Sequence, residues 1–475
     1  MHTNGVDNED FASQPLSSVL VDRLSTLGIV NPTDVQKETL PDALANKDII
    51  VKAKTGTGKT LAFVLPILQK QLNGKSSSLE KASGLRALIL CPTRELVDQV
   101  AEQLRSIAKA IPNYKVLQLT GGMPIGPQLA SLKHVPEAIV ATPGRLLDVL
   151  SKSKLSLDNL QTMVIDEADR IMDMGFADQM QRVFDIINAS VSDPQYMLFS
   201  ATLPASVQHL VSPLFRQPQV IEVQSQVQHD LIEQVAWQLT DDNKRYYSVA
   251  ALLTEYQPQS CIVFCNKKRE VDELYQYLLS NKFDVIALHG DMQQSERDNA
   301  LRKFKTACAN VMVASDVAAR GLDIDTVELV ISAHVSVDID THIHRIGRTG
   351  RANKKGIALV LYEAMQQNHI ERLADATQQK IPSKKSQALR FHANRIRQAL
   401  FKGLIISAGK KQKINKVDIV GVLTKQAMLP PDDLGKIIVS AQSTFIAVKL
   451  RSVKPALKCF RGNKIKGKRV SVKAT

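Results

Sequence analysis

Short apolar runs alternate with amphipathic helical stretches through most of this 475-residue chain, and the alternating series occurs twice. In the first series we predict strands at "DIIVKA", "ALILCP", "AIVATP" and "TMVIDE", each ending in polar, Gly or Pro residues. In the second we predict them at "SCIVFCN", "DVIALHGD", "VMVASDVA", "VELVISAHV" and "IALVLY". Strands that alternate with helices imply right-handed crossovers and a parallel sheet covered on both faces. The sequence therefore predicts two tandem α/β domains, at residues 11–218 and 225–380, with a joint near residues 218–238.

The excess positive charge of the chain lies in its C-terminal fifth. Residues 381–475 hold 22 Lys and Arg against 3 Asp and Glu, whereas the rest of the chain holds 39 against 44. A concentrated basic segment indicates a polyanionic partner, and nucleic acid is favoured over a membrane because no lipid anchor or basic amphipathic helix is evident. A solvated tail kept for solubility is the alternative, but the apolar alternation in this segment exceeds what a disordered tail needs.

The basic segment itself divides into two parts. A helical, basic connector is predicted over residues 381–408, and a small α+β domain of the ferredoxin-like type over residues 409–475. Its four strands are predicted at "KVDIVGVL", "KIIVSA", "TFIAVKL" and "KRVSVKAT". Alternation along the third of these places three residues inward and three outward: inward Ile446, Val448 and Leu450, outward Phe445, Ala447 and Lys449.

Cysteine use and hydropathy indicate a cytoplasmic protein without a membrane segment. No apolar run approaches the roughly 20 residues that a membrane span needs, and the first residues lack a secretory pattern. Cys261 and Cys265 share one face of a predicted strand, but no second pair or histidine cluster completes a metal site. We therefore expect all five cysteines to be buried, reduced thiols: Cys91, Cys261, Cys265, Cys308 and Cys459.

A phosphate-binding loop is predicted at "AKTGTGKT", from Ala53 to Thr60, because it follows a strand and opens a helix. Gly56 and Gly58 let the backbone turn its N–H groups toward phosphate oxygens, and the helix start adds positive potential. Lys59 supplies a charge for the β- and γ-phosphates, and Thr60 a hydroxyl for Mg²⁺. Ala53 stands where the usual pattern has Gly. A plain Gly-rich turn is the alternative, but it does not explain why strand, Gly-Lys-Thr and helix coincide.

Three acids fall within four residues in "MVIDEADRIMD", directly after another predicted strand. Asp166 therefore emerges at the carboxyl edge of a parallel sheet, where ligands bind in such folds. A divalent cation there turns the repulsion among Asp166, Glu167 and Asp169 into attraction. Asp166 and Thr60 are the expected Mg²⁺ ligands, largely through water, and Glu167 is placed to orient or deprotonate an attacking water. A solvated acidic helix start is the alternative for this motif alone.

From Phe11 to about residue 360 the chain resembles the DEAD-box RNA helicases, because motifs of that family occur in its order. They are Gln36 in "NPTDVQ", "AKTGTGKT", "PTRELVDQ", Gly121-Gly122, "TPGR", "DEAD", "SAT", "IVFCNKK", "HGDMQQSER", "ASDVAARGLDI" and "HRIGRTGR". The resemblance implies two RecA-like parallel-sheet domains and an RNA-stimulated ATPase that converts ATP and water to ADP and phosphate.

The resemblance also implies roles in the ATP site. Phe11 would stack on the base, Gln36 would read the adenine edge with its amide, and Asp323 would bond the ribose. The implied ATP-binding set is Phe11, Thr33, Gln36, Ala53, Lys54, Thr55, Gly56, Thr57, Gly58, Lys59, Thr60, Gly321 and Asp323. The implied catalytic set is Lys59, Asp166, Glu167, Arg348 and Arg351. Its two arginines would reach the γ-phosphoryl group only when the domains close. The set that couples hydrolysis to strand separation is Asp169, Ser200, Thr202 and His344, with the hydroxyls of "SAT" bonding Asp169 or His344.

RNA is expected across both domains, bound through phosphates and 2′-hydroxyls and hence with little sequence preference. The implied contacts in the first domain are Thr93, Arg94, Gly122, Thr142, Gly144 and Arg145. Those in the second are Asn266, Gly290, Gln294, Arg297, Ser315, Asp316 and Arg320. His342 stands where the family often has Tyr, a departure that bears on a contact to "SAT" but leaves the arginines in place.

The C-terminal segment resembles the tail of the DbpA subfamily of bacterial DEAD-box proteins, an RRM-like fold. That tail recognises a hairpin of large-subunit ribosomal RNA, so the resemblance implies pre-ribosomal particles as partners, a role in 50S assembly, and a monomer. Only one aromatic remains on the third strand, so we expect recognition by charge and shape rather than by stacking alone. The expected tail contacts are Phe445, Lys464, Lys466, Lys468 and Arg469.

Two other functions compete with an ATP-dependent helicase. An RNA clamp or assembly scaffold would use ATP only to close, with negligible turnover, but Glu167, Arg348 and Arg351 are all present, which argues against it. A DNA-directed motor is the other, and the "DEAD", "SAT" and "HRIGRTGR" set favours RNA. An assay of phosphate release distinguishes the helicase from the clamp. Replacing RNA by DNA in that assay distinguishes it from the DNA-directed motor.

Overall fold

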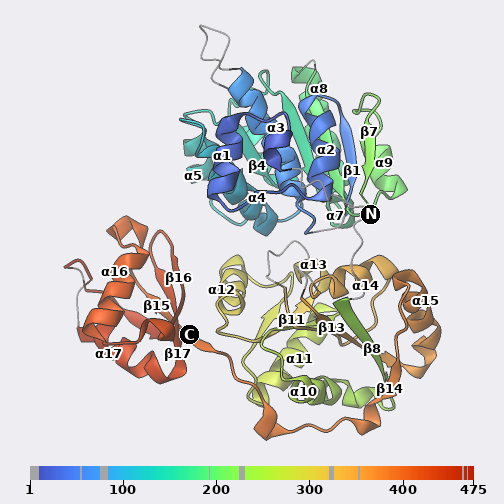
Figure 1. The fold of residues 1–475 in the computed structure, drawn as a ribbon, viewed down its shortest axis with the longest axis vertical. Coiled ribbons are helices and arrows are strands. Elements are labelled where there is room, and N and C mark those ends of the chain that lie inside the picture. Colours follow the sequence, from blue (N-terminus) through green and yellow to red (C-terminus); the bar gives the residue numbers. More distant parts are fainter. Residues whose placement is uncertain are drawn as a thin grey trace, which may run out of the picture. The chain divides into compact units, whose positions relative to one another are not determined.

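The computed structural model divides into two compact units after residue 226 (Figure 1). It describes residues 10–53, 56–74, 84–191, 193–223, 231–319, 326–350, 354–462, 465–467 and 469–475. The predicted fold class is confirmed, because the chain contains two parallel seven-stranded sheets and a small antiparallel sheet near its C-terminus.

The first unit is built on a parallel sheet with strand order β3-β4-β2-β5-β6-β1-β7. Its strands are β1 (Ile49–Lys52), β2 (Ala87–Leu90), β3 (Val116–Leu119), β4 (Ala138–Ala141), β5 (Thr162–Asp166), β6 (Gln195–Ser200) and β7 (Gln219–Glu222). Its helices are η1 (Phe11–Ser13), α1 (Ser18–Thr26), α2 (Asp34–Leu44), α3 (Lys59–Asn73), α4 (Arg94–Ala108), α5 (Ile125–Ser131), α6 (Pro143–Lys152), α7 (Ala168–Asp173), α8 (Ala177–Ser190) and α9 (Ala205–Val211). The four strands predicted in this unit are confirmed as β1, β2, β4 and β5, whereas β3, β6 and β7 were not predicted.

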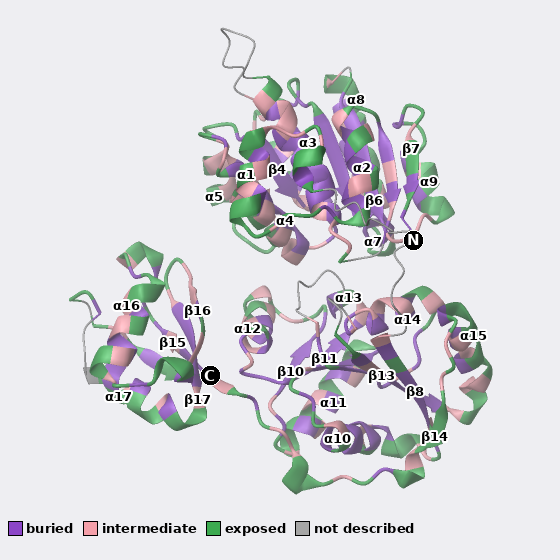
Figure 2. Cartoon of the chain, viewed as in Figure 1, coloured by how far each residue is buried: buried purple, intermediate pink, exposed green. Residues whose placement is uncertain are grey.

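Alternating side chains along each strand divide the core of the first unit between two faces. Ile89 of β2 belongs to the cluster formed with α2, α3 and α4, whereas its neighbours Leu88 and Leu90 belong to the cluster formed with α6 and α8. Figure 2 shows the strands of this sheet coloured largely as buried. A sheet covered on both faces leaves its strand ends as the place where polar residues can gather.

The second unit contains a parallel sheet with strand order β10-β11-β9-β12-β13-β8-β14. Its strands are β8 (Ile232–Leu239), β9 (Cys261–Cys265), β10 (Val285–Leu288), β11 (Val311–Ser315), β12 (Leu329–Ser332), β13 (Gly356–Glu363) and β14 (Ser383–Lys385). Its helices are η3 (Asp242–Lys244), α10 (Arg245–Tyr256), α11 (Lys268–Ser280), α12 (Gln294–Lys305), α13 (Asp316–Ala319), α14 (Ile339–Ile346), η4 (Ala364–Gln366) and α15 (Gln367–Thr377). All five strands predicted in this part of the chain are confirmed, and β8 and β14 add to them.

The tail domain, residues 401–475, forms an antiparallel sheet with strand order β16-β17-β15-β18. Its strands are β15 (Phe401–Ile406), β16 (Leu434–Val439), β17 (Thr444–Lys449) and β18 (Val472–Ala474). Its helices are η7 (Lys410–Gln412), α16 (Lys416–Gly421), the π-helical turn η8 (Val422–Gln426), η9 (Pro431–Asp433), η10 (Leu450–Ser452) and α17 (Val453–Gly462). The connector before it holds β14 and two short turns, η5 (Ser386–Ala388) and η6 (Ala393–Arg395).

Three predictions for the tail are corrected. The segment "KVDIVGVL" is not a strand but α16, because Asn415 caps its start and Ile419, Val422 and Leu423 are buried at helical spacing. The first strand of the sheet is instead β15, which lies inside the segment predicted as a helical connector. Leu450 was predicted to point inward, but it follows the strand and is exposed.

The prediction for the cysteines is confirmed, because all five are free and buried. Cys261 and Cys265 lie on one face of β9, in the same apolar cluster. Among the helices in the described part of the chain, none is long and apolar enough to cross a bilayer.

Lys70 of α3 lies near the amino ends of the strands of the first sheet, and its burial should make the stability of the protein depend on pH. Its ammonium donates to Asn46 at 2.5 Å, Thr162 at 3.1 Å and Gln195 at 2.5 Å. Burial lowers the pKa of Lys70 from 10.5 to about 8, with the nearby Asp48 opposing the shift. Because this pKa is lower in the folded protein, the unfolded chain holds more protons between pH 8 and pH 10.5, and the free energy of unfolding should rise with pH there.

We expect Lys70→Met to remove this rise in the free energy of unfolding, as measured by urea unfolding at about pH 8 and about pH 10. Equal pH slopes in both proteins would show that Lys70 does not titrate in this range.

Candidate active site and RNA-binding edges

Strand order in the first sheet brings the three predicted ATP-site segments together. β1, β6 and β5 are consecutive in the sheet, and they lead into the phosphate loop, "SAT" and "DEAD" respectively. The strands are parallel, so their carboxyl ends lie at one edge. The backbone N–H of Ala53 donates to the carbonyl of Ser200 at 2.9 Å, which joins the start of the phosphate loop to "SAT".

The phosphate loop has the backbone that its glycines predict. Gly56 and Gly58 have φ values of 89° and 92°, in the left-handed region that residues with a Cβ rarely adopt. Lys59 begins α3, is buried, and donates from Nζ to the carbonyl of Ala53 at 2.7 Å. The predicted phosphate-binding ammonium thus lies against the loop, at the positive end of a helix. Thr60 follows in the first turn.

Gln36 is tied to the phosphate loop. Its Oε1 accepts from the backbone N–H of Thr33 at 3.0 Å, and its Nε2 donates to the carbonyl of Gly58 at 2.9 Å. Both ends of the amide are therefore engaged within the protein, and reading an adenine edge with both ends would require these bonds to be exchanged. Phe11 was expected to stack on the base, but its ring is 1% exposed and lies in the core cluster, so this structure does not present it to a ligand.

The acids of "DEAD" are held in a buried, strained turn. Asp166, Glu167 and Asp169 are all buried. Glu167 has φ 51° and ψ 54°, a left-handed conformation that is costly for a residue with a side chain and is often found at functional sites. Its carboxylate pairs with Arg170, also buried, a partner that the sequence analysis missed although the i, i+3 spacing permits it.

Electrostatics at Asp166 indicate a site suited to a cation. Burial raises the pKa of Asp166 from 3.8 to about 7, with Lys59 opposing the shift and Glu167 adding to it. Burial together with Asp166 and Glu167 also raises the pKa of the neighbouring Cys91 thiol. Within the described residues no group of three or more His, Cys, Asp or Glu side chains could hold a metal alone.

The hydroxyls of "SAT" bond Asp169, which is one of the two partners expected for them. Asp169 Oδ2 accepts from the backbone N–H of Thr202 at 2.9 Å and from its hydroxyl at 3.1 Å. The N–H of Asp169 donates to the hydroxyl of Ser200 at 3.1 Å. Together with the bond from Ala53 to Ser200, this forms a chain of contacts from the acids to the phosphate loop. His344, the other expected partner, lies in α14 of the second unit.

The expected RNA contacts of the first unit follow the other strands of the same sheet. Thr93 and Arg94 come after β2, Gly122 after β3, and Thr142, Gly144 and Arg145 after β4, at the carboxyl edge that also holds the ATP site. A Cβ on Gly122 would lie 1.7 Å from Nη1 of Arg94, and the φ of Gly122 is 72°. Only glycine therefore lets the guanidinium lie on this turn. Arg145 donates to the carbonyl of Met123 at 3.0 Å, which holds the same turn.

The expected RNA contacts of the second unit follow β9, β10 and β11, which are neighbours in that sheet. They are Asn266, Gly290, Gln294, Arg297, Ser315 and Asp316. Arg345 is 1% exposed and joins two of them, with guanidinium bonds of 2.7 Å to Asp316 and of 2.7 Å to Asn266. Arg345 was not among the predicted site residues, although "HRIGRTGR" contains it.

Arg348 is buried in the turn after α14, where its carbonyl accepts from Val327 at 3.1 Å. His342 is fully buried, and its ring bonds Gln234 at 3.0 Å. The ring of His342 therefore has a partner inside the second unit, and the expectation that His342 bears on a contact to "SAT" stays a prediction.

In the tail, Lys466 and Arg469 are exposed, and Lys466 pairs with Asp418 at 2.8 Å. Phe445 is buried. Eight predicted site residues lie outside the described residues: Lys54, Thr55, Arg320, Gly321, Asp323, Arg351, Lys464 and Lys468.

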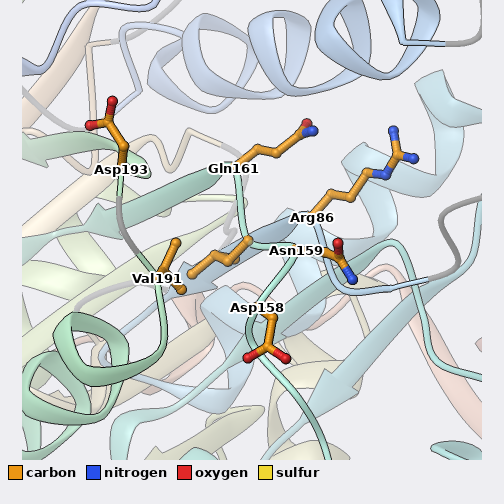
Figure 3. A pocket seen from close by; sticks show the side chains of 7 residues that line it. Arg86, Asp158, Asn159, Gln161, Val191 and Asp193 are labelled. Carbon is orange, nitrogen blue, oxygen red and sulfur yellow. The ribbon is translucent and has the colours of Figure 1, made fainter. Parts of the chain in front are cut away.

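A hollow in the first unit lies away from these motifs. Figure 3 shows its lining, which comes from segments around the amino ends of β2, β5 and β6, at the opposite edge of the sheet. Its residues are Arg86, Asp158, Asn159, Leu160, Gln161, Val191 and Asp193. This hollow holds none of the predicted site residues.

Comparisons with known proteins match all three parts of the chain. The DEAD/DEAH box helicase model matches residues 33–210, the helicase conserved C-terminal domain residues 244–353, and the DbpA RNA binding domain residues 404–474. The ATP-dependent RNA helicase DbpA of Escherichia coli (strain K12) is 41% identical over 454 residues, which are 95% of this chain and 96% of that protein.

Two solved helicases share the fold at 27% identity. Dbp5 of S. cerevisiae, bound to RNA and ADP BeF3, has a TM-score of 0.69 over 79% of this chain and 95% of its own. Mss116p, bound to ssRNA and AMP-PNP, has a TM-score of 0.71 over 81% of this chain and 80% of its own. Fold and site thus define an ATP-dependent RNA helicase with an added RNA-binding domain. The chain belongs to the DEAD-box helicases, and within them to the DbpA subfamily.

Proposed function

We propose that this helicase locally opens duplexes in large-subunit ribosomal RNA, to which its tail binds at a hairpin, and that it acts on pre-ribosomal particles during 50S assembly. The observation that carries the proposal is the match of the tail to the DbpA RNA binding domain, in a segment with 22 basic and 3 acidic residues. We expect it to act as a monomer in the cytoplasm, a reducing compartment that suits five free cysteines.

We propose that the first unit binds ATP at the joined ends of β1, β6 and β5. Lys59 would bond the β- and γ-phosphates, and Glu167 would orient and deprotonate the attacking water. Asp166 and Thr60 would hold Mg²⁺ largely through water, and the chemistry that Mg²⁺ supplies when bound is neutralisation of phosphate charge. The raised pKa of Asp166 supports this assignment, since a buried carboxylate gains most from a nearby cation.

We propose that RNA and ATP are bound together when the two units close. Arg348 and Arg351 would then reach the γ-phosphoryl group, and the bonds of Asp169 to Ser200 and Thr202 would carry the change toward the RNA contacts. The solved relatives support this, because Dbp5 and Mss116p each hold RNA together with a nucleotide analogue. Hydrolysis would release the RNA, so that each cycle opens only a short duplex.

Phosphate release titrated with RNA tests the target. We expect a hairpin fragment of large-subunit ribosomal RNA to activate the full-length chain at much lower concentration than an unrelated RNA of equal length, at one stated salt concentration. Equal activation by both RNAs would remove the ribosomal target. RNA binding without phosphate release would favour the clamp instead.

Removal of the tail should abolish the preference for the hairpin. The cut should follow Leu400, because ending the chain at residue 408 would leave β15 without the strands it pairs with. We expect residues 1–400 to keep ATP hydrolysis with excess unrelated RNA, since the proposed ATP site lies in the first unit and the expected fingers in the second. Hairpin and unrelated RNA should then give equal half-saturation in the phosphate-release assay. A retained preference would place recognition in the helicase domains.

Gly122→Ala should weaken RNA binding selectively. The added Cβ would meet the guanidinium of Arg94 and would also demand a left-handed backbone that costs about 1 kcal/mol. We expect the RNA concentration for half-maximal ATP hydrolysis to rise by roughly tenfold, the effect of losing one charge-assisted hydrogen bond, with KM for ATP unchanged at saturating RNA. Gly126→Ala is the matched control, because nothing lies within 4 Å of its added Cβ. Similar titrations for both variants would contradict the role of the Arg94 turn.

A further inference from the structure

The outward face of the tail sheet is covered by the same chain. Phe445 and Ala447 of β17 are 1% and 0% exposed, and they form a buried cluster with Cys308, which lies between α12 and β11 of the second helicase domain. Phe401 and Ile405 of β15 pack against this cluster. Alternation correctly placed Phe445 on the outward face, but its expected role as an exposed stacking residue is not what the structure shows.

Contacts from the end of α12 hold the two domains together. The guanidinium carbon of Arg302 lies 5.8 Å from the centroid of the Phe445 ring, within the range of a cation–π interaction. The backbone N–H of Phe401, the first residue of β15, donates to the carbonyl of Ala307 at 3.1 Å. Burial lowers the pKa of Lys303, and the charge of Lys402 of β15 lowers it further.

The segment leading into the tail is fixed on the same surface. Asn310 donates from its side chain to the carbonyl of Arg397 at 2.9 Å, and the N–H of Ala399 donates to Asp284 at 2.8 Å. Leu389, farther back in the connector, is buried in the core of the second helicase domain. The tail therefore does not hang from a loose linker.

Two glycines let the aromatic rings lie flat on the tail sheet. A Cβ on Gly403 would lie 2.5 Å from Cζ of Phe445, and one on Gly435 would lie 3.0 Å from Cε1 of Phe401. Aromatic residues that bind RNA on an RRM sheet must present a ring face to a base. Here both rings lie against the sheet backbone, Arg302 covers the ring of Phe445, and Phe401 packs against the cluster that Phe445 forms with Cys308.

We propose that the outward face of the tail sheet is a docking surface for the second helicase domain and not a base-stacking surface. Docking fixes the tail at the C-terminal end of α12, while the expected RNA contacts Gln294 and Arg297 occupy the first turn of that helix. A helix of 12 residues spans about 18 Å, so the two RNA-binding surfaces are held at a set spacing. The hairpin must then bind another surface of the tail. Only this last point rests on the proposed function.

Alkylation of Cys308 reports docking directly. The other four cysteines are also buried. Mass spectrometry of the peptide that contains Cys308 distinguishes labelling of Cys308 from labelling of the others in the full-length chain. We expect slow labelling by iodoacetamide in the wild-type protein, and labelling about tenfold faster or more in Arg302→Glu, the effect of losing a desolvated cation–π contact and reversing its charge. Lys305→Glu is the control, because it makes the same charge change at an exposed position of the same helix. Phe445→Ala offers a second disruption from the tail side.

Addition of hairpin RNA tests whether the outward face of the tail sheet binds RNA or the second helicase domain. With saturating ribosomal hairpin fragment, we expect Cys308 to stay as protected as in its absence, because the RNA does not compete for the docked face. Labelling that accelerates when hairpin is added would show that RNA displaces the helicase domain from the sheet, and would overturn the proposal. Equally fast labelling in the wild type and in Arg302→Glu would overturn docking itself. Neither result depends on ATP hydrolysis, so a failure of the proposed ribosomal role is recognised separately, by the absence of hairpin binding.

Discussion

Lys59→Ala should reduce RNA-stimulated ATP hydrolysis by roughly 10²–10³-fold, the cost of removing one preorganised group that stabilises developing charge. The Lys59 ammonium is buried and bonds the phosphate loop at Ala53, so no mobile side chain can replace it easily. Its loss also leaves Asp166 without the opposing charge of the ammonium, and the pKa of Asp166 should rise further because Lys59 now lowers it. ATP affinity should fall together with turnover.

Phosphate release and binding of a fluorescent ATP analogue measure the two effects of this variant. Lys52→Ala is the matched control, because Lys52 ends β1, the strand that leads into the phosphate loop, but is half-exposed and forms a surface ion pair with Glu222 at 3.5 Å. Such an exposed pair contributes little, so the control should behave as the wild type. Near-normal turnover by Lys59→Ala would show that the loop at Ala53–Thr60 does not hold the phosphates.

Glu167→Gln should separate ATP binding from hydrolysis. The amide keeps the shape of the side chain and still accepts a hydrogen bond from Arg170, but it cannot take a proton from water. We expect turnover to fall by roughly 10²–10⁴-fold, the usual contribution of a general base, while nucleotide affinity is retained. RNA should dissociate more slowly from the variant in ATP, because the hydrolysis that releases it is blocked.

Single-turnover hydrolysis and RNA dissociation kinetics test this variant together. Asp178→Asn removes the same charge at an exposed position at the start of α8 and should leave both rates unchanged. Normal turnover by Glu167→Gln would exclude Glu167 as the base. Loss of turnover with equally lost nucleotide affinity would instead indicate that the Glu167–Arg170 pair is needed for the fold of the site.

The sequence predicted the parts of the fold that local pattern determines. Buried strands are continuous apolar runs, so β1, β2 and β5 were evident, and the polar residues that follow them mark the carboxyl edge. Strand β7 was missed because it lies at the edge of the sheet and its exposed residues interrupt the apolar pattern. In the tail, an apolar run reads equally well as a short helix or a strand, and Asn415 was the neglected sign of a helix start.

The environments of the site side chains could not be predicted from the sequence pattern, because they depend on contacts between residues far apart in the chain. Motif spacing placed Asp166 and Glu167 correctly. The bond from Gln36 to Gly58, however, depends on where α2 packs against α3, and the burial of Phe11 depends on a core cluster formed by distant parts of the chain. Arg345 was missed because its partners Asp316 and Asn266 lie 29 and 79 residues away in the chain. Phe445 faces outward as period-two alternation requires, yet its cover comes from a segment more than a hundred residues earlier.

The central claim is that ATP and RNA together draw the two units into contact, and the distance between the units tests it most directly. Dyes on Asp178→Cys in the first unit and Met365→Cys in the second label exposed positions, while the native cysteines stay buried. Energy transfer should be measured in the full-length chain without ligand, with AMP-PNP, with RNA, and with both. We predict a shortened distance only when both are present, and in the Glu167→Gln variant with ATP and RNA as well. The same distance in all of these states would contradict the account.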